Sequence, residues 1–228
     1  IKKEAEVLDL GCGDGKILNI LSRELQVKPL GIEIDEDNLN KCIASGLSVI
    51  QQDIDDGLDN FSDNSFDTVI ISQTIQVLKE PKKALLEVTR IGTESIVTIP
   101  NFGFWTTRFK LLFTGKMPVT NDLPSSWFET ENIHLCTIKD FESLCNELSI
   151  NIAEKRFFNP SGKESFLINF LQNLFASSEP SKNIIGILYF FAKVRSEFMK
   201  IKPPFSRIIR LNLLTLKKFL ANHSVETN

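Results

Sequence analysis

Three glycines at alternate positions separate an apolar strand pattern from a helical one in the segment VLDLGCGDGK, residues 7–16. Gly11, Gly13 and Gly15 predict a turn whose backbone angles side chains resist and which lets a ligand approach the main chain closely. Residues 16–25 then carry apolar side chains at a helical period, and the N-terminus of such a helix presents free N–H groups to a ligand. The segment therefore predicts the first strand–turn–helix unit of a nucleotide-binding α/β fold.

Strand and helix patterns alternate along the rest of the chain. Strands are expected at residues 7–10, 29–34, 47–50, 66–71, 95–99, 150–158 and 184–193, and helices at residues 16–25, 36–45, 80–90 and 137–148. A buried helix is the alternative for residues 184–193. This alternation predicts right-handed βαβ units, and so a mostly parallel sheet covered by helices on both faces. Residues 101–135 break the rhythm with prolines and aromatic residues, which predicts a long functional loop, a lid or substrate-facing insertion.

The spacing of the glycines distinguishes between cofactors. Dinucleotide enzymes use G-x-G-x-x-G, whereas this turn reads G-x-G-x-G and has Lys16 where the last glycine would stand. Asp9 and Asp14 beside the turn would also repel a diphosphate. An acidic rim suits the sulfonium and ammonium groups of S-adenosylmethionine (SAM). The sequence therefore favours SAM over a dinucleotide, and a structural turn that binds nothing is the alternative.

Later segments supply the other candidate residues of this pocket. After the second strand, GIEIDED (31–37) offers Glu33 to the ribose hydroxyls, with Asp35 as second choice and helix capping as the alternative role. QQDIDDG (51–57) then places a carboxylate and an apolar side chain for the adenine, unless it is only an acidic solvated turn. SQTIQVL (72–78) would form the floor near the transferred methyl. The candidate cofactor-binding residues are Asp9, Gly11, Cys12, Gly13, Glu33, Ile34, Asp53, Ile54 and Ser72.

No catalytic residue is assigned from the sequence. Methyl transfer from a sulfonium needs in-line placement more than it needs a base, and SQTI stands where amino-methylating enzymes often carry N-P-P-[FYW]. His134 is a candidate base, and fixing the insertion is its favoured alternative role. The large aromatic residues of the insertion wall an acceptor pocket or form a docking face for another protein. They are Phe102, Phe104, Trp105, Trp127 and Phe128.

Charge and cysteine usage bound the class of protein. Residues 1–178 hold 17 basic against 26 acidic residues, and residues 179–228 hold nine against three. An acidic body argues against nucleic-acid binding. The basic amphipathic segment 203–221 is expected to cover its own domain, with membrane-surface contact as the alternative.

The chain has four cysteines without a C-x-x-C pair, and two histidines, which predicts no metal site. Free thiols also predict a reducing cytoplasm. A chain that starts at Ile1 and enters a strand at once suggests a missing N-terminal piece.

Several longer motifs give the chain a family resemblance. VLDLGCGDG, GIEIDED, SFDTVIISQTIQVL, IVTIPNFGFW, MPVT, LPSSWFET, NIHLCTIKDFESLC and FFNP together resemble the methionine-biosynthesis MetW family over roughly residues 7–178. The resemblance implies a seven-stranded class I methyltransferase fold and a role beside homoserine O-acyltransferase, MetX. It also implies SAM binding at Asp9, Gly11, Gly13, Glu33, Asp53 and Ile54. The chain departs from the family pattern by continuing well beyond Ser178.

The sequence thus predicts a Rossmann-like SAM-binding domain over residues 1–193, with the insertion at 101–135, and a basic extension over residues 194–228. The expected function is that of a MetW-like partner of homoserine O-acyltransferase. The alternative is an independent SAM-dependent methyltransferase that acts on a small molecule or a lipid precursor. Methyl transfer to a purified acceptor without any partner protein would favour the independent methyltransferase over the acyltransferase partner.

Overall fold

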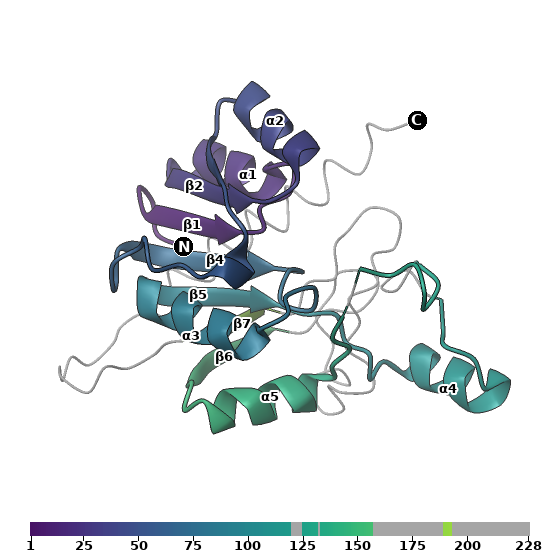
Figure 1. The fold of residues 1–228 in the computed structure, drawn as a ribbon. Helices are drawn as coiled ribbons and strands as arrows, with labels where there is room; N and C mark the ends of the chain where they lie inside the picture. The colour runs from purple at the N-terminus through teal and green to yellow at the C-terminus, as the bar shows by residue number, and fades with distance from the viewer. Residues whose placement is uncertain (120–124, 132, 157–188, 193–228) are drawn as a thin grey trace.

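The computed structural model describes residues 1–119, 125–131 and 133–156, together with the backbone of residues 189–192. A twisted sheet lies at its centre, with helices on both faces (Figure 1). Five strands are parallel, in the order β3-β2-β1-β4-β5. They are β1 (Glu6–Leu10), β2 (Lys28–Glu33), β3 (Ser48–Gln51), β4 (Phe66–Ser72) and β5 (Gly92–Thr98). The order reverses between β1 and β4, which is where open sheets leave a crevice at the carboxyl ends of their strands.

The chain adds antiparallel strands beyond β5. β7 (Tyr189–Ala192) pairs with β5, and β6 (Ile152–Arg156) pairs with β7. The backbone of residues 189–192 is extended, as the strand interpretation of residues 184–193 requires. Residues 184–188 and 193 lie outside the described residues, as do the last two residues of the strand predicted over 150–158.

Alternating side chains divide the core between the two faces of the sheet. The helices are α1 (Lys16–Leu25), α2 (Glu36–Ala44), α3 (Pro81–Ile91), α4 (Trp105–Thr114), α5 (Ile138–Glu147) and the short 3-10 helix η1 (Ile54–Asp56). On β1, Val7 packs with α1 and α2, whereas Leu8 and Leu10 pack with α3 and α5. Each of these fully buried side chains contributes roughly 1.5–3 kcal/mol of burial free energy. Asp9 shares the face of Val7, so its carboxyl group lies on the α1 side.

The elements predicted up to residue 100 are found, with their ends shifted by at most three residues. The largest shift is at β5, which begins at Gly92 rather than Ser95. The helix predicted over residues 137–148 is also found. Thr137 is its N-cap, and a capping box joins it to Asp140, whose carboxylate accepts the Thr137 backbone N–H.

The insertion contains a helix where a long loop was predicted. Trp105–Thr114 form α4, and Gly115 ends it in the left-handed conformation, with its N–H bonded to the Leu111 carbonyl. The loop prediction is wrong here because the prolines that prompted it follow the helix rather than lie within it. The ends of the insertion are tied together, since the Phe102 N–H donates to the Cys136 carbonyl.

The basic extension 194–228, with its predicted helix at 203–221, lies outside the described residues. Within the part that is described, no helix is long and apolar enough to cross a bilayer. In that same part, no group of three or more histidine, cysteine, aspartate or glutamate side chains is placed to hold a metal ion.

Candidate functional site

The three glycines of the turn after β1 are required for different reasons. All have left-handed backbone angles, with φ of +72° at Gly11, +55° at Gly13 and +75° at Gly15. A Cβ at Gly11 would overlap the Thr74 side chain, and a Cβ at Gly15 would overlap side chains of α2 and of the loop after it. A Cβ at Gly13 would meet no described atom within 4 Å. Gly11 and Gly15 therefore serve packing, whereas Gly13 borders open space.

Glu33 lies at the end of β2 and faces this turn. One carboxylate oxygen, Oε2, accepts the Gly13 N–H at 2.7 Å, and Oε1 accepts the N–H groups of Ile34 and Asp35 at 2.9 Å each. The Glu33 side chain is buried, and these three backbone N–H groups hold its negative charge beside Gly13. A carboxylate oxygen offers two lone pairs, so Oε2 keeps one for a further donor. A ligand hydroxyl can take it.

The second-choice acid has a different task. The Asp35 side chain is exposed, and it caps α2 by accepting the Asn38 N–H at 2.9 Å. The alternative interpretation of these acids as helix caps thus holds for Asp35, while Glu33 is directed at the glycine turn. Ile34 lies between them with 58% of its surface exposed, an apolar side chain at the edge of the same turn.

Asp9 is a buried acid that is left unpaired. Only 1% of it is exposed, and neither of its carboxylate oxygens has a hydrogen-bond partner among the described residues. Burial, together with a smaller repulsion from Glu33, raises the pKa of Asp9 to about 7. Because an unpaired buried carboxylate is costly, this group is suited to a cationic ligand.

Asp9 should make the ligand-free protein less stable as the pH rises. Its pKa is higher in the folded protein than the ordinary value of 3.8, so the folded state binds the extra proton. The free energy of unfolding should therefore be highest below about pH 4 for this group, and should fall as the pH rises through 7. We expect Asp9→Asn to melt at a higher temperature than the original protein at pH 8, with a smaller difference at pH 5. Asp35→Asn is the matched control, and an Asp9→Asn variant that is less stable at pH 8 would contradict this account.

Cys12 was predicted to line the pocket, and the structure turns its side chain into the core. The Cys12 Sγ lies 3.9 Å from the Sγ of Cys42 on α2, and 8% of the residue is exposed. Burial raises the pKa of the Cys12 thiol, which disfavours a reactive thiolate. The main chain of Cys12 is what belongs to the turn, because its N–H donates to the Ile32 carbonyl.

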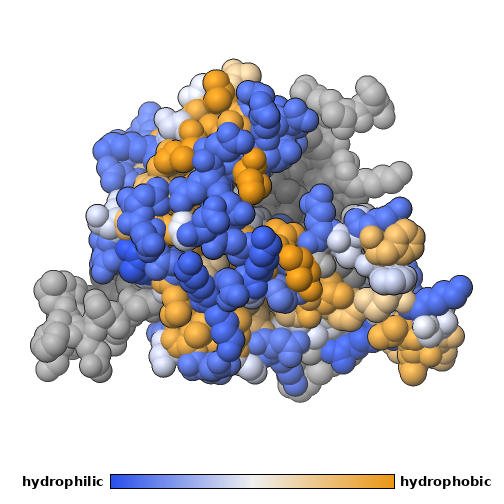
Figure 2. Space-filling model, in the orientation of Figure 1, coloured by the Kyte–Doolittle hydropathy of each residue, from blue (hydrophilic) through white to orange (hydrophobic). Residues whose placement is uncertain are grey.

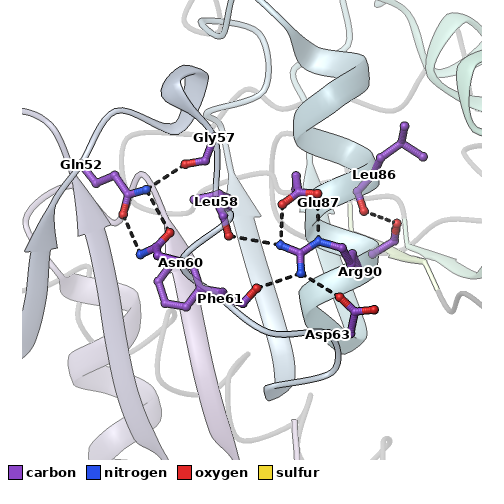
Figure 3. A network of polar contacts seen from close by, with 10 residues as sticks. Gln52, Gly57, Leu58, Asn60, Phe61, Asp63, Leu86, Glu87 and Arg90 are labelled. Atoms are coloured by element: carbon purple, nitrogen blue, oxygen red, sulfur yellow. Dashed lines mark hydrogen bonds and ion pairs between the residues drawn. The ribbon is translucent and has the colours of Figure 1, made fainter.

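The segment after β3 is braced by its own side chains. Asp53 accepts the Asp55 N–H at 2.9 Å and so caps η1, while Ile54 packs half-buried against the core. Gln52 donates to the Gly57 carbonyl at 2.8 Å and bonds to Asn60 across the loop (Figure 3). Asp53 therefore has a capping role that was not predicted for this segment, and one of its carboxylate oxygens is engaged in it.

The loop between η1 and β4 is held to α3. Arg90 donates to the carbonyls of Leu58 and Phe61 at 3.1 and 2.8 Å, and it forms ion pairs with Glu87 and Asp63 (Figure 3). These bonds fix a loop that has no regular structure of its own. The edge of the sheet beside Asp53 is therefore pre-formed.

The segment after β4 contacts the other parts of the site. The Ser72 hydroxyl, a predicted pocket group, bonds to Thr98 on β5 at 3.0 Å. Two residues not predicted for the site also contribute here. The Asp55 carboxylate accepts the backbone N–H groups of Lys79 and Glu80, and so joins the segments that follow β3 and β4. The second such residue is Thr74, whose side chain lies against Gly11. No local sequence pattern at Asp55 or Thr74 indicates these long-range contacts.

His134 contributes its main chain to this region. Its N–H and that of Ile133 both donate to the Gln76 carbonyl at 2.9 Å, which ties the insertion to the segment after β4. The His134 side chain is exposed. The bonds that the structure shows for this residue are those of the insertion-fixing role.

The aromatic residues of the insertion divide into two groups. Phe104 is buried and Phe102 is half-buried. Trp105, Trp127 and Phe128 are 41%, 73% and 68% exposed. The rings of Trp127 and Phe128 meet edge to face at 5.6 Å between centroids. Most of this aromatic surface therefore faces outward, as a docking face requires.

Known proteins resemble the chain in sequence and in fold. The model of the family described as "Methionine biosynthesis protein MetW" matches residues 1–179. The bifunctional methionine biosynthesis protein MetXA/MetW of Rhodopirellula baltica is 32% identical over 164 residues, which are 68% of this chain and 26% of that protein. This chain thus spans about a quarter of the length of that relative.

Two solved structures share the fold at low identity. One is a chain from the complex between the Haloferax volcanii Trm112 methyltransferase activator and a putative methyltransferase, at TM-score 0.60 and 14% identity, covering 85% of this chain and 84% of that one. The other is a SAM-dependent methyltransferase from Archaeoglobus fulgidus, at TM-score 0.57 and 18% identity, covering 83% and 86%. At such identity the likeness establishes a methyltransferase-like α/β fold and no activity.

Proposed function

Because the chain belongs to the family of the methionine biosynthesis protein MetW, we propose that its glycine turn, Asp9 and Glu33 form a SAM-binding site. The observation that carries the proposal is the unpaired Asp9 carboxylate, together with the open space at Gly13, whose N–H donates to Glu33. A ligand with a cationic end and a vicinal diol satisfies both buried acids. SAM has both groups, and the methyltransferase-like fold supports it.

Each candidate residue has a role in this proposal. Asp9 faces the ammonium group, and Glu33 accepts a ribose hydroxyl on its free Oε2 lone pair. Gly11, Gly13 and the Cys12 main chain shape the turn that the ligand approaches. The adenine lies near Ile34, Asp53 and Ile54, and Ser72 lies on the floor. SAM supplies a methyl group carried on a sulfonium, and these residues bind and orient it.

Glu33→Ala should weaken SAM binding at least tenfold. The variant loses a charge-assisted hydrogen bond to the ribose, worth roughly 1.5–3 kcal/mol, and tenfold corresponds to about 1.4 kcal/mol. Calorimetric titration measures the affinity. Circular dichroism checks the fold, because three backbone N–H groups also lose their acceptor.

Asp35→Ala is the matched control for Glu33→Ala. It removes the α2 cap, which costs about 1 kcal/mol of stability, and it should leave SAM affinity within about threefold. If Asp35→Ala lowers the affinity more than Glu33→Ala does, the ribose acid has been assigned wrongly.

We further propose that the chain acts beside homoserine O-acyltransferase, MetX, through its insertion. The Rhodopirellula relative carries MetXA and MetW in one name, and the exposed aromatic residues of the insertion support a docking face. A SAM-dependent change in acyltransferase activity on adding this protein is the direct test. No effect of the protein on the acyltransferase, with or without SAM, would contradict the partnership.

The remaining parts of the proposal concern the whole chain. β6 and β7 would complete the seven-stranded class I sheet beyond β5. Residues 1–193 would form the SAM-binding domain, and residues 194–228 a basic extension that covers it. The proposed compartment is the cytoplasm, which the free thiols of all four cysteines support.

A further inference from the structure

One face of α4 carries large apolar side chains that water covers. Trp105, Phe109, Leu112 and Phe113 stand at positions i, i+4, i+7 and i+8 of the helix, so they share one side of it. Their exposed fractions are 41%, 48%, 73% and 76%. The rings of Phe109 and Phe113 stack at 5.7 Å between centroids, and Trp105 meets Phe109 at 6.0 Å. These four side chains form a continuous ridge, called here the α4 stripe.

The stripe points away from the other residues that the structure describes. Thr107 is the buried residue of α4 among those described, and a turn of 100° per residue places it opposite the stripe. The helix projects from the sheet, and hydrophobic surface lies over it (Figures 1 and 2). A ten-residue helix is marginal in water without packing. An exposed aromatic stripe on such a helix is explained if another surface covers it.

The charges around the stripe indicate the chemistry of the surface that would cover it. Residues 101–119 contain Arg108, Lys110 and Lys116 and no acidic residue, although residues 1–178 as a whole are acidic. By helical geometry, Arg108 and Lys110 lie on opposite sides of the stripe. A complementary surface is therefore apolar along its centre and carries carboxylates on both margins.

We propose that the α4 stripe docks into an apolar groove with acidic margins on a partner protein. Anchors at i, i+4 and i+7 are the pattern by which a helix enters such a groove. The inference rests on the proposed partnership with the acyltransferase and deepens it, since it names the docking element and the chemistry of the groove.

Two other occupants fit the observations less well. An anionic bilayer is a continuous surface rather than a groove along α4, so it would also meet the exposed Glu129 and Glu131 of the same insertion and repel them. A second copy of the chain would pack its own α4 stripe against this one, and the basic margins with Arg108 and Lys110 would then face like charges. One hollow among the described residues lies between α5 and β6, and polar side chains such as Glu142, Asn146 and Lys155 line it, so it does not match the apolar stripe.

Three variants of the full chain test the stripe against purified homoserine O-acyltransferase in a calorimeter. Phe109→Ser should weaken the complex at least tenfold, because it removes the central anchor of the stripe. Leu111→Ser is the matched control, since Leu111 is 40% exposed on the other side of the same helix. It should change affinity less than threefold. Lys110→Glu should weaken the complex at low salt, with a smaller effect at high salt.

Each outcome decides a separate point. Circular dichroism and SAM titration confirm that every variant is folded. If the unaltered chain binds the acyltransferase and Phe109→Ser binds as tightly, the inference is overturned and the partnership stands. If the unaltered chain does not bind it, both are overturned. Loss in Phe109→Ser of self-association, or of binding to phosphatidylglycerol vesicles, with the acyltransferase complex unchanged, would assign the stripe to a different occupant.

Discussion

Gly13→Val is expected to abolish measurable SAM binding while the protein stays folded. Gly13 borders open space in the ligand-free structure, so a larger side chain fits there without displacing a described neighbour. In the complex, that same space belongs to the ligand, and the two branches of valine would occupy it. The left-handed φ of +55° adds strain of about 1–2 kcal/mol. Calorimetric titration with SAM measures the loss of binding.

Gly46→Val separates the loss of ligand space from the backbone strain. Gly46 also has a left-handed φ, of +75°, and a Cβ there would meet no described atom within 4 Å. It lies in the turn between α2 and β3, at the opposite end of the parallel strands from the glycine turn. Both variants should lose similar stability, and only Gly13→Val should lose SAM. Equal SAM affinity in the two variants would remove Gly13 from the pocket.

Trp127→Ala or Trp105→Ala should weaken binding to homoserine O-acyltransferase by about 2 kcal/mol or more, roughly thirtyfold. Both side chains are large, rigid and exposed, at 73% and 41%, and both lie in the insertion. Interface energy concentrates in such aromatic anchors. SAM affinity should stay nearly unchanged, because neither residue belongs to the glycine turn or to the edge beside Glu33. Binding of each ligand is measured separately on the same protein preparation.

Leu86→Ala provides the control for these tryptophan variants. Leu86 is 47% exposed on α3, away from the insertion, and its truncation should affect neither ligand. The reverse pattern, with SAM binding lost and the complex intact, would make the insertion a lid over the cofactor. That result would remove the main support for the partnership.

The sequence predicts the glycine turn well, because its requirement is local. Left-handed backbone at three alternate positions needs glycine, and the flanking strand and helix have clear periods. What the sequence does not tell is which glycine borders open space. All three have similar backbone angles, and only their neighbours differ, such as Thr74, more than sixty residues away from Gly11.

The two buried acids, Glu33 and Asp9, show the same division between local and long-range causes. Strand position predicts Glu33 as the ribose acid, and the structure directs it at Gly13. The three backbone N–H groups that hold it depend on how the turn and the strand end meet in space. The unpaired state of Asp9 could not be predicted either, since it depends on burial by elements far along the chain.

The insertion shows where pattern recognition failed. Its prolines and aromatic residues predicted a long loop, although the prolines follow α4 rather than lie within it. α4 turns its apolar side outward. An outward apolar stripe is evidence for a partner, and it is visible only once the body of the fold is in place.

The most direct test of the SAM-binding account is a calorimetric titration of the unaltered protein with S-adenosylhomocysteine, followed by the same titration of Gly13→Val and Glu33→Ala. S-adenosylhomocysteine keeps the ribose and the ammonium group that Glu33 and Asp9 are proposed to meet. The account predicts saturable binding at one site, abolished in Gly13→Val and weakened at least tenfold in Glu33→Ala. Absence of saturable binding to the unaltered protein, or equal affinity in all three proteins, would contradict it.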